Sequence, residues 1–133
     1  MRVYRLEGSG GFGPYTDVWI THEGQTIEER LVDSHGYDDW HLGIFEDLIT
    51  PYHHKNLRCA CLSLPGLKFW FGGFWWGLIR AGYRVHWYEI REENLLPTRS
   101  MRQVGFSIEN VEETGKLPLF LTLLKPPRDT SSL

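Results

Sequence analysis

Three glycines near the start of the chain, Gly8, Gly10 and Gly13, have the spacing G-x-G-x-x-G of loops that bind dinucleotide phosphates. That function requires a strand before the loop and, after it, a helix whose N-terminus faces the pyrophosphate. Here Gly13 is followed by Pro-Tyr-Thr-Asp and then by the β-branched, aromatic stretch DVWIT, which is typical of a strand. We therefore interpret the spacing as a glycine-rich loop whose backbone approaches another group closely, next to Arg5.

His41 is the first candidate for acid–base chemistry. It lies near Asp38 and Asp39, from which Trp40 separates it, and precedes Asp47 by six residues, so a carboxylate could orient it as a general base. The same residues are also typical of a solvated helix face. Both interpretations stay open, and the solvated face is favoured.

A zinc site is a second possibility, because Cys59 and Cys61 follow His53 and His54 closely. The spacing C-x-C differs from the C-x2-C of zinc ribbons and fingers. Two cysteines separated by one residue in a strand simply point to the same side. We predict small buried residues here and no metal site.

The main element that we expect to position these groups is the segment SLPGLKFWFGGFWWGLIRAGY, residues 63–83. Ser63 is a good N-cap, a proline lies in the first turn, and Gly82 is placed to end a helix. One predicted helix face is apolar, and this face should anchor the core; it comprises Leu67, Trp70, Phe71, Phe74, Trp75, Leu78 and Ala81.

The opposite face of this predicted helix carries Phe69, Trp76 and Arg80 together with the two mid-helix glycines, Gly72 and Gly73. Glycines inside a helix cost about 1 kcal/mol each relative to alanine. A second covering layer would explain the outer aromatics. The alternative is an aromatic platform for a ligand ring or a partner protein.

The remaining periodicity predicts strands near residues 2–7, 17–21, 83–90, 101–108 and 117–124, with a hairpin turn across VEETGK. Shorter helices are expected at TIEERLVDS, which opens with a capping-box spacing, and at DDWHLGIFEDLIT. The predicted fold is α+β: a mainly antiparallel, curved sheet packed by one long aromatic helix and one or two shorter helices. Residues 1–127 form one domain and residues 128–133 a disordered tail.

Composition and charge argue against some classes of function. The net charge of −3 and the sequence pI near 6.0 argue against binding to a nucleic-acid backbone. The longest apolar run is far below the roughly 18 residues that span a bilayer. The opening residues have no secretory signal pattern, and two cysteines suit a reducing compartment. We expect a cytoplasmic protein with no membrane or nucleic-acid partner.

Several motifs occur in a recognisable order: VYRLE, GFGPY, Trp-His at 40–41, CLSLPGLKFWFGGFW, AGYRVHWYEI and RQVGFSI. Over residues 2–108 the chain resembles a family of small phage- and prophage-encoded proteins. In that family a Tyr-Arg strand precedes Gly-Pro-Tyr, a helix S-L-x-x-L-x-x-W-F precedes a strand G-[FY]-x-V, and Q-V-x-F comes last. The resemblance implies action in the host cytoplasm on a host or defence protein.

The chain is also similar, more loosely, to ADP-ribosyltransferase-like folds. That similarity implies that Arg5 holds the NAD diphosphate or ribose, with Gly13 in the loop that rims the cleft. Tyr15 or Trp70 would stack on nicotinamide, and Gln103 would take the catalytic position. The family has Glu there, and Gln can neither carry the negative charge nor act as a base. NAD binding is thus better supported than transfer, and enzyme activity stays open.

Two alternatives remain. A non-catalytic inhibitor, of the counter-defence or anti-CRISPR-like kind, would dock through the exposed aromatics, with Phe69, Trp76 and Arg80 as contacts. A small structural or accessory virion protein would instead self-associate.

Overall fold

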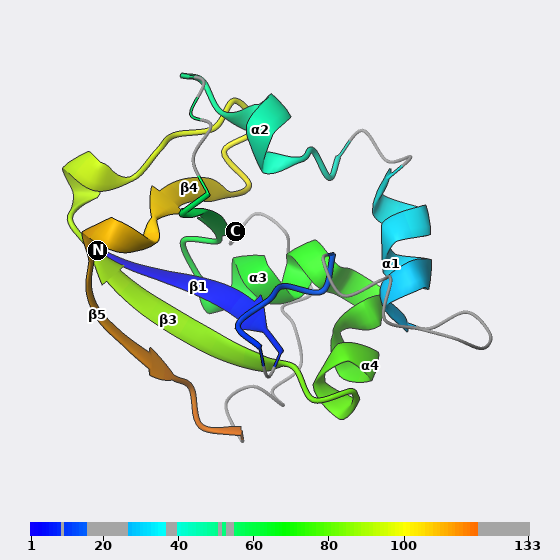
Figure 1. Cartoon of the computed structure of the whole chain (residues 1–133). Coiled ribbons are helices and arrows are strands. Elements are labelled where there is room, and N and C mark those ends of the chain that lie inside the picture. Colours follow the sequence, from blue (N-terminus) through cyan, green and yellow to red (C-terminus); the bar gives the residue numbers. More distant parts are fainter. Residues whose placement is uncertain (9, 16–26, 37–39, 51, 53–54, 120–133) are drawn as a thin grey trace.

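The computed structural model describes residues 1–8, 10–15, 27–36, 40–50, 52 and 55–119 (Figure 1). Strands β1 (Arg2–Glu7), β3 (Arg84–Ile90) and β5 (Val111–Lys116) form an antiparallel sheet in the order β1-β3-β5. Strands β2 (Leu57–Ala60) and β4 (Val104–Ser107) form an antiparallel pair. The α+β class predicted from the sequence is confirmed.

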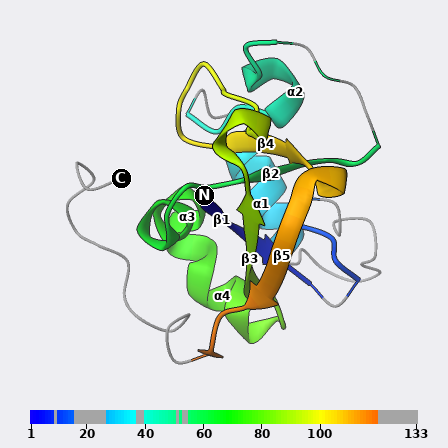
Figure 2. The ribbon, with the colours of Figure 1, turned by 90° about the vertical axis from the view of Figure 1, so that its left-hand side faces the viewer.

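Tyr4 and Cys61 join the two sheets. The amide of each donates to the carbonyl of the other, at 2.8 and 2.9 Å, so that the end of β2 lies against the middle of β1. The result is a curved surface with β5 and β4 at its two ends (Figure 2).

The aromatic segment is helical as predicted but is interrupted at its glycines. Helix α3 (Leu64–Phe71) is followed by a 3-10 turn, Gly72–Phe74, and by α4 (Trp75–Arg80). The Ser63 hydroxyl accepts from the Gly66 amide at 3.0 Å, which confirms the predicted cap. Gly72 has a φ of 53° and Gly82 a φ of 110°, values that favour glycine, so the first ends α3 and the second follows α4.

The predicted apolar stripe survives this interruption. Its buried members pack with Leu6 and Val85 of the sheet, which places the main core between the sheet and α3–α4; they are Leu67, Trp70, Phe71, Trp75 and Leu78. Phe74 is half-buried and Ala81 is exposed. Each large buried side chain stabilises the fold by roughly 1.5–3 kcal/mol.

The predictions of the two shorter helices had different outcomes. The first prediction is confirmed by α1 (Ile27–Gly36). The second was too long, because α2 comprises only Ile44–Asp47 and the Trp-His pair precedes it. Gly43 is extended (ψ 149°) and Leu48 leaves the helix to bridge Thr98, so tertiary pairing prevails over the helical periodicity.

The predicted hairpin across VEETGK is wrong. These residues are the edge strand β5 itself, paired with β3. Gly115 is not a turn residue: a Cβ there would lie 2.6 Å from the Trp87 ring, which covers the strand. The predicted strand 101–108 is shortened to β4, while strand 17–21 and most of strand 117–124 lie outside the described residues.

Candidate ligand cavity

A cavity of about 280 Å³ opens between β1, β2, α3 and the segment before α2. We call it the Arg5 cavity. Five of the residues singled out in the sequence line it: Arg5, Gly13, Tyr15, Trp70 and Gln103. Its other walls are largely apolar, from Leu6, Pro14, Leu42, Ile44, Leu67 and Phe71. Residues from six separate parts of the chain thus meet at one hollow.

Arg5 is held in place on two sides. Its Nε donates to Oε2 of Glu7 at 3.0 Å, and its Nη1 donates to the carbonyl of Cys59 at 3.0 Å. A Cβ on Gly13 would lie 3.3 Å from Nη2, so the glycine loop does approach the guanidinium closely. Nη2 makes no hydrogen bond with any residue that the structure describes. It is the donor that the cavity can use.

Glu7, which sequence reasoning missed, is the buried counter-ion of Arg5. Its Oε2 also accepts from the Tyr88 hydroxyl, and its Oε1 lies 3.5 Å from Nδ1 of His86. Burial and the Glu7 carboxylate raise the pKa of Tyr88, and burial lowers the pKa of His86. Glu7 follows Arg5 by two residues, which places both on one face of the strand; that spacing was the available signal.

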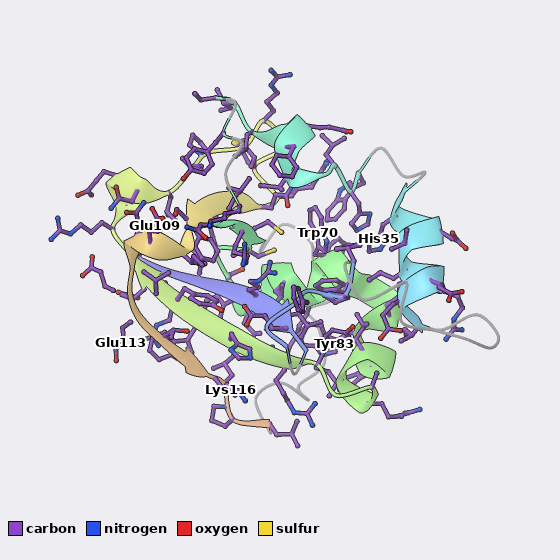
Figure 3. The ribbon with its side chains drawn as sticks, in the orientation of Figure 1. His35, Trp70, Tyr83, Glu109, Glu113 and Lys116 are labelled. Carbon is purple, nitrogen blue, oxygen red and sulfur yellow. The ribbon has the colours of Figure 1, made fainter. Side chains whose placement is uncertain are left out.

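Tyr15 and Trp70 are fixed to each other. The Tyr15 hydroxyl accepts from Nε1 of Trp70 at 2.8 Å and lies 2.6 Å from Nδ1 of His35. His35 and Trp70 reach this hydroxyl from α1 and α3 (Figure 3). The Tyr15 ring stacks on Phe71, with centroids 5.9 Å apart, and burial raises the Tyr15 pKa. The Tyr15 hydroxyl and Nε1 of Trp70 are hydrogen-bonded to each other. These two rings can therefore present apolar faces to a ligand.

Gln103 is buried at the start of β4. Its Nε2 donates to the carbonyl of Leu42 at 2.9 Å and to Oδ2 of Asp47 at 3.0 Å. Two acceptors fix the amide orientation, and Oε1 is left as its unpaired atom among the described residues. Gln103 can therefore accept a hydrogen bond from a ligand.

Asp47, which the sequence suggested only as an orienting partner for His41, is fully buried beside Gln103. It accepts from the amide of Ser100 at 2.8 Å and from the Ser100 hydroxyl. Burial alone would raise the pKa of this carboxyl, but the hydrogen bonds from Ser100 and Gln103 and the Arg102 charge bring it below its usual value. Asp47 stays ionised and positions its neighbours.

The other predicted site residues lie elsewhere. His41 does not line the cavity: its Nε2 is 2.7 Å from the carbonyl of Trp70, and its ring stacks on His35 with centroids 3.5 Å apart. Phe69 packs edge-on against Trp40, while Trp76 and Arg80 are exposed one turn apart on α4. Their roles stay predictions.

Two features are absent from the described residues. None of their His, Cys, Asp and Glu side chains form a group of three able to hold a metal ion. In the same part of the chain, every helix is too short or too polar to cross a bilayer.

Comparison with known proteins returns one family. No curated protein and no solved structure matches the chain. Residues 1–120 match the family described as the bacteriophage T4 Y00F protein. The chain therefore belongs to this bacteriophage protein family.

Proposed function

We propose that the Arg5 cavity binds a ligand that combines a flat ring with an anionic group, and that the nicotinamide half of NAD is such a ligand. The observation that carries the proposal is the placement of Arg5. Its side chain is only 12% exposed, two of its nitrogens are fixed by Glu7 and Cys59, and the third faces the cavity beside Gly13. A fixed guanidinium at a partly enclosed apolar site is well suited to an anion.

The other lining groups fit the rest of this ligand. Trp70 and Tyr15 supply ring faces for stacking. Oε1 of Gln103 can accept from the carboxamide of nicotinamide or from a ribose hydroxyl. A volume of about 280 Å³ is at the lower end for ligand pockets. We therefore propose that one half of the dinucleotide enters and the other half stays outside.

We propose binding rather than group transfer. Of the described residues that line the cavity, none carries a carboxylate. Asp47 is hydrogen-bonded to Gln103 and Ser100, and Glu7 is hydrogen-bonded to Arg5 and Tyr88, so both carboxylates are engaged by protein groups. An amide in this position can hold a ribose but cannot stabilise a developing positive charge as an ionised carboxylate does.

Membership of a bacteriophage protein family supports a role during infection. We propose that the protein acts in the infected cell on a host or defence protein and that ligand binding in the cavity serves that action. A non-catalytic inhibitor is the second candidate, favoured by the exposure of Trp76 at 37%. It predicts that Trp76→Ala weakens target binding while Arg5→Ala leaves it unchanged.

Calorimetric titration tests ligand binding. Nicotinamide mononucleotide and NAD should bind with similar affinity, and nicotinamide, which lacks the anion, much more weakly. Arg5→Lys keeps the charge but cannot reach Glu7, Cys59 and the cavity together, so the mononucleotide should bind at least about tenfold more weakly.

Arg84→Lys is the matched control, because Arg84 is also half-buried and, among the described residues, its side chain donates to the carbonyls of Ile79 and Tyr83 alone. It should leave the affinity unchanged. The absence of saturable binding of both nucleotides at millimolar concentration would refute the proposal.

A further inference from the structure

A second hollow, of about 360 Å³, shares Cys61 as a lining residue with the Arg5 cavity. We call it the Trp40 groove, and its described lining is Trp40, Cys61, Leu62, Ser63, Gly66, Phe69, Met101 and Arg102. Neither the family nor the proposed ligand gives it a role.

The groove combines apolar walls with an exposed rim. Phe69 and Trp40 pack edge to face with centroids 5.7 Å apart and form its wall. Leu62 is 50% exposed and Met101 84% exposed. Exposed leucine and methionine beside a hollow leave apolar surface in water that a large side chain could cover. Methionine adapts readily to the shape of such a side chain.

The rim has a defined backbone conformation that hydrogen bonds hold in place. Met101 has a φ of 60°, which is unfavourable for a residue with a side chain. The turn is held by Asp47, which accepts from both the amide and the hydroxyl of Ser100, and the Ser100 hydroxyl accepts in turn from the Arg102 amide at 3.2 Å. The buried carboxylate thus fixes the backbone that presents Met101 to solvent.

Arg102 gives the groove its charge. The guanidinium lies 4.5 Å from the centroid of the Trp40 ring, and its Nη1 donates to the Trp40 carbonyl at 3.2 Å. Its remaining nitrogens have no partner among the described residues. Arg102 is also the only charged side chain among the residues described as lining the groove, in a chain of net charge −3. A positioned arginine with open donors recognises a carboxylate.

We propose that the Trp40 groove is a docking site for a partner protein, and that the segment it takes carries a large apolar side chain next to an Asp or Glu. The apolar side chain would enter between Phe69 and Met101, and the carboxylate would pair with Arg102. Nucleic acid is the less suitable occupant, because one arginine on an acidic protein gives little attraction for a phosphate backbone.

Short blocked peptides isolate these two contacts. Ac-Phe-Glu-NH2 is titrated into the full chain carrying 13C-methyl methionine, and the Met101 methyl and Trp40 indole signals are followed by NMR. Saturable shifts at both signals are expected, with a dissociation constant on the order of 1 mM for so few contacts. Ac-Phe-Gln-NH2 should bind about threefold more weakly and Ac-Ala-Glu-NH2 at least about tenfold more weakly.

Protein variants complete the test. Arg102→Gln should abolish the preference for Glu over Gln in the peptide, whereas Arg99→Gln, at another exposed arginine three residues away, should preserve it. Met101→Ser, at a position too exposed to affect folding, should weaken every phenylalanine peptide.

Three results would overturn the proposal: no saturable shift with Ac-Phe-Glu-NH2, equal binding of Ac-Phe-Lys-NH2, or tighter Arg102-dependent binding of a single-stranded oligothymidylate. Because the titrations contain no nicotinamide nucleotide, this outcome is independent of the ligand proposed for the Arg5 cavity.

Discussion

The side-chain amide of Gln103 donates to the buried carboxylate of Asp47 across 3.0 Å, although the two residues are 56 positions apart. The same carboxylate accepts from Ser100. One ionised group therefore fixes both a lining residue of the Arg5 cavity and the turn at the rim of the Trp40 groove. Gln103 therefore has a structural role, which the analogy with a catalytic glutamate did not predict.

Gln103→Glu should destabilise the protein instead of creating a catalytic acid. At neutral pH it places a second carboxylate against Asp47 and removes a donor, so the free energy of unfolding should fall by about 2–4 kcal/mol. The buried new carboxyl has a raised folded-state pKa, so the loss should shrink as the pH falls and the group becomes protonated. Urea denaturation between pH 8 and pH 4 measures this trend.

Gln103→Met serves as the uncharged control. It removes the same hydrogen bonds without adding a charge, so its effect on stability should vary much less over this pH range, with only a small change near pH 4 where Asp47 has lost a donor. An equal pH dependence in both variants would contradict the explanation.

Asp47→Asn should be destabilising at neutral pH by about 1–3 kcal/mol, because the amide cannot accept from Ser100 and Gln103 as the carboxylate does. The folded-state pKa of Asp47 lies below its ordinary value of 3.8. Its stabilisation is therefore fully present above the unfolded-state pKa and is lost as the pH falls through the folded-state value. The difference between wild type and variant should narrow in denaturation curves below about pH 4. A difference that stays constant down to pH 2 would show that the charge of Asp47 does not contribute.

Two glycines of the aromatic segment should respond to alanine with opposite signs. A Cβ on Gly77 would lie 2.1 Å from Cδ1 of Ile27, whereas a Cβ on Gly73 meets nothing within 4 Å. Gly73→Ala should stabilise the protein by about 0.5–1 kcal/mol, since alanine loses less entropy than glycine on folding. Gly77→Ala should destabilise it by about 1 kcal/mol, because the Ile27 side chain has to shift out of its packed position.

A double-mutant cycle with Ile27→Ala separates the two effects for Gly77. If the clash with Ile27 is the cause, Gly77→Ala should become stabilising in the Ile27→Ala background. Thermal denaturation of the four proteins is sufficient, and an unchanged penalty would place the cause elsewhere.

The two cysteines should differ sharply in their reactivity toward iodoacetamide. Cys61 is buried, its Sγ donates to the Arg102 carbonyl at 3.6 Å, and burial raises its pKa to about 12. Cys59 is only half-buried and lines the Arg5 cavity. We expect alkylation of Cys59 alone in the folded protein at pH 8, identified by peptide fragmentation, and of both residues in urea.

The rate of Cys59 alkylation also measures whether a ligand occupies the Arg5 cavity. Nicotinamide mononucleotide should slow the alkylation of Cys59 in a Cys61→Ala variant, while an unrelated sugar phosphate should slow it much less. Reaction of Cys61 before Cys59 would contradict the burial pattern.

The sequence alone determined the features that rest on local interactions. The Ser63 cap, the buried face of the aromatic segment and the ending of that segment before Gly82 depend on residues within one or two turns of each other. Strands β1 and β3 were equally clear because their side chains alternate. Arg5, Tyr15, Trp70 and Gln103 were also singled out, on a resemblance, before any geometry was known.

Tertiary structure decided everything that depends on which distant segments meet. The sequence could not show that VEETGK pairs with β3, since its Thr-Gly has the composition of a turn and only the covering Trp87 ring explains the glycine. It could not show that Glu7 and Asp47 are the buried partners of Arg5 and Gln103, because carboxylates are usually solvated and their burial depends on the donors that the fold brings to them. Local propensity is contained in a few adjacent residues, whereas a cavity exists only once several separate segments have packed.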